Sequence, residues 1–319
     1  MSTAVVRTRQ AWWVQRADGR IQPIHTEAAT TADLLADRSA VDRASRTEDG
    51  WEDLGTRELL SPVTTPCRVV AQMVNYRSHA IDSGFDPDLV PTAFFRKASG
   101  SVSGPTEEII RPDHVRLLDY EVELGLVFGA PLPLGADVAT ATLGRYIAAL
   151  VVANDVSARD VQLAKTQFYE SKSYPTFTPL GPRLLLVDDQ DLASLERLHL
   201  TCTVNGKVRQ DSTTAEMITK PDRALTALAR FQTMAPGDVL LTGTPGGTAL
   251  RSPGKALELI GSLLPPAKKW QTFFARQAKN PAYLKPGDLV TTSISTADGS
   301  LDLGTQRTPV RAATAKAHS

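Results

Sequence analysis

Two glutamates, Glu121 and Glu123, stand two residues apart in an apolar stretch of this sequence. On a β-strand the side chains at positions i and i+2 point to the same face, so we expect the two carboxylates to lie side by side. Adjacent carboxylates repel each other, and without a cation one of them tends to take up a proton. A bound divalent ion removes this conflict. The pair is therefore a candidate metal site, although a solvated strand face is the commoner origin of such a pattern.

A third acidic residue, Asp155, follows the apolar run 146–152. The end of such a run often lies at the mouth of a core element, which makes Asp155 a candidate third ligand. Three carboxylates with water suit a hard cation such as Mg²⁺, because that ion prefers oxygen ligands and retains water. The alternative is that Asp155 is a helix cap or a turn residue.

Six segments of the chain, in this order, resemble the fumarylacetoacetate hydrolase superfamily over about residues 66–310. They read LDYEVELGLVFG, ANDVSARDVQ, KSYPTFTPLGP, VNGKVRQDSTTAEMI, GDVLLTGTPGG and KPGDLV. A series of ordered segments is far more specific than any one of them. The resemblance implies that Glu121, Glu123 and Asp155 bind Mg²⁺ or Mn²⁺.

The segment NYRSHAID resembles the family's mobile lid, which carries a catalytic histidine. By this resemblance His79 and Asp82 are catalytic residues. Their i, i+3 spacing brings them together on one helical turn, and a carboxylate beside an imidazole raises its basicity. We expect the pair to remove a proton from water. Lys172 stands where the family places a lysine facing the substrate carboxylate and the developing enolate.

Four further residues are predicted to contact the substrate: Tyr76, Arg77, Gln162 and Thr244. Gln162 and Thr244 match substrate-contact segments of the family, and Arg77 is a hypothesis for a distal carboxylate. The glycine-rich loop that holds Thr244 does not match a phosphate-binding P-loop. The lid segment departs from the family pattern, because Met73 stands where the family usually has glycine. This departure leaves the substrate open.

The function predicted from the sequence is hydrolysis of a C–C bond in an acylpyruvate-like 2,4-dioxo acid. Water activated by His79 and Asp82 would attack the distal carbonyl, and the metal with Lys172 would hold the pyruvate enolate. The alternatives on the same metal site are an oxaloacetate-type decarboxylase and an isomerase of a hydroxymuconate-type diene acid. A non-catalytic binding protein is a further hypothesis, but it predicts the loss of a ligand or of the lysine.

The elements that must position these residues are mostly strands. Short apolar runs between glycine and proline turns predict strands at 68–74, 121–128, 184–187, 198–204, 239–242 and 289–295. Helices are predicted at 143–152 and 222–233. The fold class is mainly β with some α (α+β), a mixed β-sandwich or β-roll. Residues 1–65, with a hairpin near their start, form a small N-terminal domain, and residues 66–319 form the catalytic domain.

The segment 250–284 contains a helical pattern that is either an ordinary packed helix or a subunit contact or pocket lid. The 35 basic and 35 acidic side chains cancel, which argues against a nucleic-acid partner. No stretch has the length of a membrane span, and Cys67 and Cys202 form no CxxC zinc motif. We expect a cytoplasmic protein that acts on a small 2-oxo or enol carboxylic acid. By the resemblance it is a homodimer.

Overall fold

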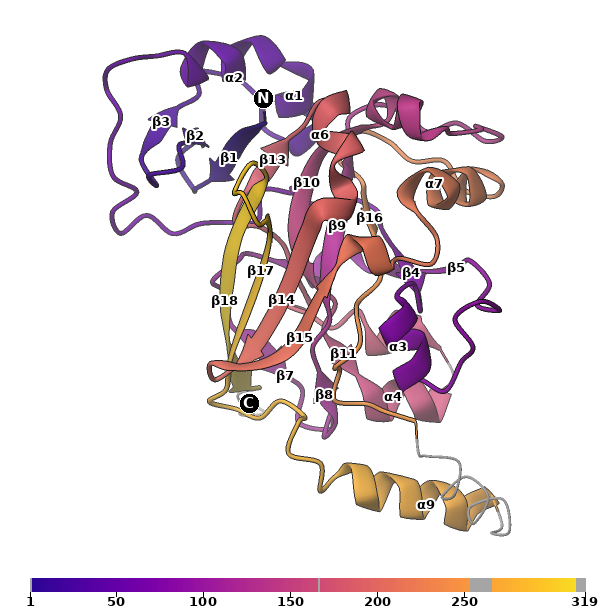
Figure 1. Ribbon diagram of the computed structural model, residues 1–319. Helices are drawn as coiled ribbons and strands as arrows, with labels where there is room; N and C mark the ends of the chain where they lie inside the picture. The colour runs from indigo at the N-terminus through magenta and orange to yellow at the C-terminus, as the bar shows by residue number, and fades with distance from the viewer. Residues whose placement is uncertain (1, 166, 253–265, 314–319) are drawn as a thin grey trace.

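The computed structural model describes residues 2–165, 167–252 and 266–313 (Figure 1). Strands predominate over helices in this part of the chain, which confirms the predicted α+β class. The largest element is a nine-stranded sheet, in which most neighbouring strands run antiparallel. Its strands, in order across the sheet, are β3 (Ile21–Pro23), β2 (Trp12–Gln15), β1 (Thr3–Arg7), β13 (Leu184–Leu186), β10 (Ile147–Asn154), β9 (Val122–Phe128), β16 (Val239–Leu241), β4 (Val69–Met73) and β5 (Ala93–Lys97).

A second, five-stranded sheet packs against the first (Figure 1). Its order is β15 (Lys207–Thr213), β14 (Leu198–Val204), β17 (Leu289–Thr296), β18 (Asp302–Ala312) and β7 (Ile109–Arg111). Every second residue of β14 is fully buried, so one face of this sheet covers the core and the other is more exposed. The main hydrophobic core lies between the two sheets.

Short elements complete the described part of the chain. Two small strand pairs join β8 (Leu118–Asp119) with β11 (Ser157–Ala158), and β6 (Val102–Ser103) with β12 (Thr178–Pro179). The α-helices are α1 (Thr31–Ala36), α2 (Arg38–Ser45), α3 (Arg77–Asp82), α4 (Arg159–Lys165), α5 (Phe168–Ser171), α6 (Asp189–Ala193), α7 (Pro221–Ala229) and α9 (Pro266–Gln277). Among the described helices, none has the length and apolar character needed to cross a membrane.

The helix predicted at 143–152 is wrong, because most of this segment forms strand β10. Strand β10 lies between β9 and β13 and is buried on both faces. A strand buried on both faces has a continuous apolar sequence, and periodicity alone cannot distinguish such a run from a buried helix. The other helix predicted from the sequence is present as α7.

The N-terminal residues extend the large sheet. The predicted hairpin forms as β2 and β3, and β1 pairs with β13 from the middle of the chain. Side chains of β1 and α1 share a hydrophobic cluster with β10 and β16. The large sheet and this cluster both contain residues from before and after residue 65. The division into two domains stays a prediction.

The segment 250–284 contributes helix α9, which lies at the end of the molecule opposite the N-terminal hairpin (Figure 1). The rings of Phe273 and Phe274 stand 5.7 Å apart, and Phe274 packs against the main core. This packing agrees with the simpler interpretation of a packed helix. Residues 253–265 of the segment lie outside the described residues.

Gln306 joins the two sheets at their buried interface. Its amide donates hydrogen bonds to the carbonyls of Val152 (2.9 Å) and Pro179 (3.1 Å), and its oxygen accepts one from Thr292 (2.9 Å). We expect Gln306→Leu to lower the free energy of unfolding by at least about 2 kcal/mol, because buried polar groups lose their partners. Denaturant unfolding measures the change. Thr305→Val, at the exposed neighbouring position, is the control, and equal effects of the two substitutions would contradict this role for Gln306.

Candidate metal centre and active site

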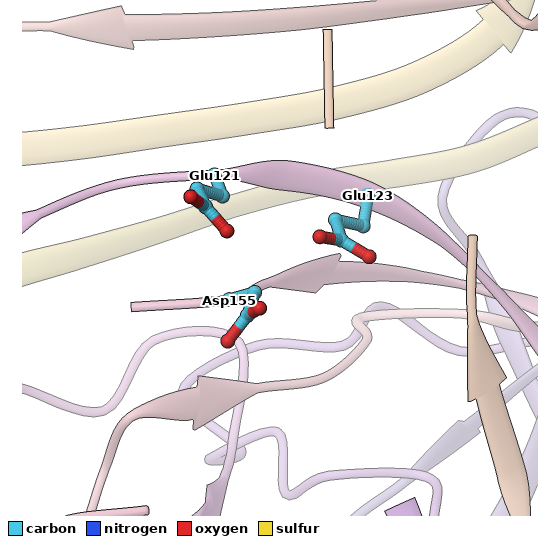
Figure 2. Close-up of side chains that lie close together, drawn as sticks. All are labelled: Glu121, Glu123 and Asp155. Atoms are coloured by element: carbon cyan, nitrogen blue, oxygen red, sulfur yellow. The ribbon is translucent and has the colours of Figure 1, made fainter. Parts of the chain in front are cut away.

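The pairing of β9 with β10 places the three candidate ligands together. Val122 is paired with Asn154, and the Asp155 N–H donates to the Glu121 carbonyl (2.8 Å), so Glu121 and Asp155 lie opposite each other. Glu123 follows Glu121 by two residues and projects to the same side of the chain (Figure 2). The strand register alone therefore brings three acidic side chains to one place.

The three carboxylates each offer one oxygen, and these oxygens lie within 4.8 Å of one another. All three side chains are buried, and Figure 2 shows Glu121 and Glu123 directed toward Asp155. Three converging carboxylate oxygens match the preference of Mg²⁺ and Mn²⁺ for hard ligands. The residues present therefore fit a divalent cation, as the sequence predicted, and leave the identity of the metal open.

Two buried lysines are in contact with these carboxylates. The Lys172 ammonium donates to Asp155 (2.7 Å) and to Glu121. The Lys97 ammonium donates to the other oxygen of Asp155 and to the carbonyl of Phe177 (3.0 Å). Asp155 therefore has a lysine on each of its oxygens.

Arg159 provides the third buried cation. Its guanidinium donates to Glu121 and to Asp119 (2.8 Å), and Asp119 also accepts from the backbone N–H groups of Ala249 (2.8 Å) and Leu250 (3.1 Å). These bonds hold the arginine in one orientation beside the triad. Asp119 thus acts on the site through Arg159.

Charge balance explains why a cation fits here. Four buried carboxylates, those of Asp119 and the triad, face three buried cations. When all four carboxylates are ionised, Lys97, Arg159 and Lys172 leave a net charge of minus one. A divalent ion would change this excess to one positive charge, which suits an anionic substrate. The cluster is therefore complementary to a metal ion together with a carboxylate ligand.

The two glutamates differ in their ionisation. Burial would raise the pKa of Glu121, but the positive charges of Arg159 and Lys172 outweigh it and lower that pKa. Burial and the negative charges of Asp155 and Glu121 raise the pKa of Glu123 well above its usual value. The Gly243 N–H donates to Glu123 (2.7 Å) and only partly offsets this effect. Glu123 is thus the ligand whose ionised form depends most on a bound cation.

The predicted pairing of His79 with Asp82 is not formed among the described residues. Asp82 accepts a hydrogen bond from the backbone N–H of Gly247 (2.9 Å), which fastens helix α3 to the glycine-rich loop. The Nδ1 atom of His79 is buried and has no hydrogen-bond partner. Burial lowers the pKa of His79, and the charges of Arg159 and Lys172 act in the same direction against the opposing charge of Glu121. Residues three apart on a helix can meet, but here the loop offers Asp82 a backbone donor.

The predicted substrate-contact residues have different surroundings. Gln162 accepts from Arg159 (3.0 Å), and the Thr244 hydroxyl donates to the carbonyl of Val122 (2.9 Å). Tyr76 is fully buried, and its burial and the charge of Glu123 raise its pKa. Gln162 is thus linked to Glu121 through Arg159, and Thr244 to the strand that carries Glu123.

Arg77 does not join this cluster. Its guanidinium pairs with Asp88 (3.0 Å) and about half of its side chain is exposed (49%). The predicted contact between Arg77 and a distal substrate carboxylate therefore has no support from this arrangement.

Sequence reasoning missed Lys97, Asp119 and Gln210. Gln210 is buried, accepts from the N–H of Val122 (3.0 Å) and donates to the Thr244 hydroxyl (2.7 Å), so it links the metal-binding strand to the glycine-rich loop. Asp119 and Gln210 lie inside segments that the resemblance had already marked. Lys97 ends strand β5, which contains two phenylalanines. These apolar neighbours were the sequence signal that this lysine could be buried.

Comparison with known proteins adds an independent finding. The family model described as "Fumarylacetoacetate (FAA) hydrolase C-terminal" matches residues 68–311. A mitochondrial oxaloacetate tautomerase of Rattus norvegicus is 36% identical over 192 residues, a match that covers 60% of this chain and 59% of the relative. The chain thus spans about three fifths of the length of that relative.

Two solved structures are similar over almost the whole chain. A probable 2-hydroxyhepta-2,4-diene-1,7-dioate isomerase from Mycobacterium abscessus is 27% identical, with a TM-score of 0.72 over 98% of this chain and 100% of that one. A fumarylacetoacetate hydrolase from Exiguobacterium antarcticum is 26% identical, with the same TM-score and the same coverage. Similar scaffolds therefore carry at least two different reactions.

Replacing Lys97 tests the charge balance of the site. We expect Lys97→Met to destabilise the metal-free protein by about 3–5 kcal/mol, because it leaves the buried Asp155 with one cation fewer. Saturating Mg²⁺ or Mn²⁺ should restore much of this loss, since the ion replaces the missing charge. Thermal unfolding with and without metal measures both effects. Arg96→Met, at the exposed neighbouring position on β5, is the control, and a loss that metal does not reduce would contradict the prediction.

The lowered pKa of His79 predicts the pH dependence of catalysis. A histidine base works in its neutral form, which is the major form above its pKa. Because this pKa is lowered from 6.5, the acid limb of kcat/KM should lie below pH 6.5. Asp82→Asn should leave the limb in place, since Asp82 bonds to Gly247 and not to the imidazole. An acid limb above pH 6.5, or a limb that moves to lower pH in Asp82→Asn, would show that His79 and Asp82 pair during turnover.

Proposed function

The chain belongs to the fumarylacetoacetate hydrolase family, and on that premise we propose that it is a divalent-metal-dependent enzyme that interconverts the keto and enol forms of an oxaloacetate-like 2-oxo dicarboxylate. The family relatives named above are enzymes: a tautomerase, an isomerase and a hydrolase. Their reactions all require a carbanion next to a carbonyl or enol to be stabilised. The proposal assigns this chain the simplest of these reactions.

One observation carries the proposal: the Lys172 ammonium is fixed between Glu121 and Asp155, with the Arg159 guanidinium beside it on Glu121. Fixed donors of this kind stabilise negative charge as it develops, because they need no reorganisation during the reaction. Burial lowers the pKa of Lys172, but the negative charges of Asp155 and Glu121 outweigh it and raise that pKa, so the group stays positively charged. The site is thus built to hold an enolate oxygen.

A metal ion held by Glu121, Glu123 and Asp155 would polarise the 2-oxo group and so acidify the neighbouring C3 proton. His79, as a neutral imidazole, takes that proton, and the electron pair moves onto the C2 oxygen. Lys172 and Arg159 hold the resulting negative charge. The imidazolium of His79 then returns the same proton to the C2 oxygen, which gives the enol. No atom is gained or lost.

Hydrolysis of an acylpyruvate-like acid, the function predicted from the sequence, shares the enolate with this reaction. It needs in addition a water that is activated close to a distal carbonyl. In the expected mechanism a His79–Asp82 pair supplies that activation, and in the structure Asp82 is bonded to Gly247 instead. A proton transfer by His79 alone needs no such pair, which is why we place tautomerisation first. Hydrolysis, decarboxylation and diene-acid isomerisation stay competing predictions.

The test is a direct assay of keto–enol exchange of oxaloacetate by the purified protein, followed by ultraviolet absorbance and NMR. We expect catalysis with Mg²⁺ or Mn²⁺ and none after EDTA treatment. Lys172→Met should lower kcat by about 100-fold or more while the metal still binds, because it removes a fixed donor to the enolate. Metal affinity, measured by calorimetry, separates this effect from loss of the ion.

The matched control is Lys165→Met, since Lys165 pairs with Glu170 on the surface and not with the triad. A Lys172→Met protein that keeps wild-type turnover with metal bound would refute the role of Lys172. An acylpyruvate cleaved with no exchange of oxaloacetate would instead establish the hydrolase. The same substrate panel, extended to hydroxymuconates, covers the isomerase.

A further inference from the structure

A hollow of about 630 Å³ is lined in part by Tyr120, the residue that precedes Glu121 in the chain. Tyr120 and Gly247 form part of its wall, joined by a hydrogen bond from the Tyr120 hydroxyl to the Gly247 carbonyl (3.2 Å). Helix α9 and the residues after it form another part. The hollow is therefore built from the metal-binding segment, the glycine-rich loop and the segment whose role the sequence left open.

The lining of this hollow is strongly cationic. Four basic side chains take part, namely Arg209, Arg251, Arg276 and Lys279, and none of the described residues that line the hollow is acidic. The protein has equal numbers of acidic and basic residues, so such a segregation of charge is not a consequence of composition. Arg251, Arg276 and Lys279 are exposed and Arg209 is partly buried, so the hollow has a positive potential that attracts anions from solvent.

Little within the described part of the chain neutralises these cations. The Nε atom of Arg209 is buried and has no hydrogen-bond partner. Arg251 forms a long ion pair with Asp82, with 3.9 Å between its Nε atom and a carboxylate oxygen. A buried guanidinium nitrogen without an acceptor is uncommon in folded proteins, and the positive charge of Arg209 therefore lacks a hydrogen-bonded counterion at this atom.

We propose that this hollow binds a small polyanion, a phosphate or carboxylate compound with two or more negative charges. Guanidinium groups recognise both classes through paired hydrogen bonds, and asparagine, glutamine and tyrosine side chains in the same lining add neutral polar contacts. The inference does not depend on the reaction catalysed at the triad.

The hollow is also connected to the lid helix α3, which carries His79. Gly247 donates to Asp82 at the end of that helix, and the Ser252 N–H donates to the Asp82 carbonyl (2.8 Å). Gly247 has a left-handed backbone (φ +101°), and a side chain there would collide with the Arg209 carbonyl. The hollow and helix α3 therefore share the residues that hydrogen-bond to Asp82.

Isothermal titration calorimetry of the metal-loaded protein tests the site, with inorganic phosphate and propane-1,2,3-tricarboxylate as separate probes. We expect binding of at least one probe, weakened about tenfold or more when Arg276→Glu and Lys279→Glu are combined. Glu123→Gln, which changes the metal triad, should leave this affinity unchanged. Binding of either probe alone supports the site and identifies the class of its ligand when the Arg276 and Lys279 double variant weakens it and Glu123→Gln does not.

The control is Arg38→Glu combined with Arg46→Glu, which changes the net charge equally on helix α2 and its end. Thermal unfolding without ligand checks that both double variants are folded. Absence of binding by the unchanged protein would overturn the proposal. It would also be overturned if both double variants lost affinity equally, which indicates bulk charge. If Glu123→Gln lost affinity for the anion while the Arg276 and Lys279 double variant kept it, the anion would be assigned to the metal centre instead.

Discussion

Burial of four carboxylates in one place is the constraint on which the rest of this structure depends. Ionised groups are costly to remove from water, and like charges a few ångströms apart add to that cost. The chain meets the constraint by placing Lys97, Lys172 and Arg159 against them and by directing backbone N–H groups at Asp119 and Glu123. When all four carboxylates are ionised, one negative charge exceeds the three cations, and a divalent ion would compensate it. Binding of such an ion would then be linked to folding.

The backbone that satisfies this constraint comes from distant parts of the chain. The register of β9 against β10 brings Asp155 beside Glu121, and the loop after β16 supplies the Gly243 N–H to Glu123. The same loop fastens the lid helix through Gly247, where the close approach of another strand leaves no room for a side chain. The carboxylate of Glu123, the glycine-rich loop and helix α3 are consequently joined by hydrogen bonds.

The sequence predicted that Glu121, Glu123 and Asp155 converge, because they lie in segments with a strong local pattern, and the structure brings them together. The strands followed from apolar runs between turns, and the one large error, the helix predicted at 143–152, arose because a doubly buried strand has no polar period. Lys97 could not be found in this way. Its place beside Asp155 depends on how distant strands are ordered in the sheet, which no local pattern records. The partner of Asp82 was missed for the same reason.

In the proposed reaction and in the competing ones the triad and Lys172 would stabilise an enolate, so they do not distinguish hydrolysis from proton transfer. The surroundings of His79 on helix α3 would distinguish them. Where a carboxylate is free to orient the histidine, the imidazole becomes a stronger base and can activate water. In this chain the loop holds Asp82, and His79 remains a weaker base that suits a carbon acid already acidified by a metal. Structures with similar scaffolds have the names of enzymes with different reactions, and the hydrogen bond from Gly247 to Asp82 is the feature of this chain on which the proposed choice between them rests.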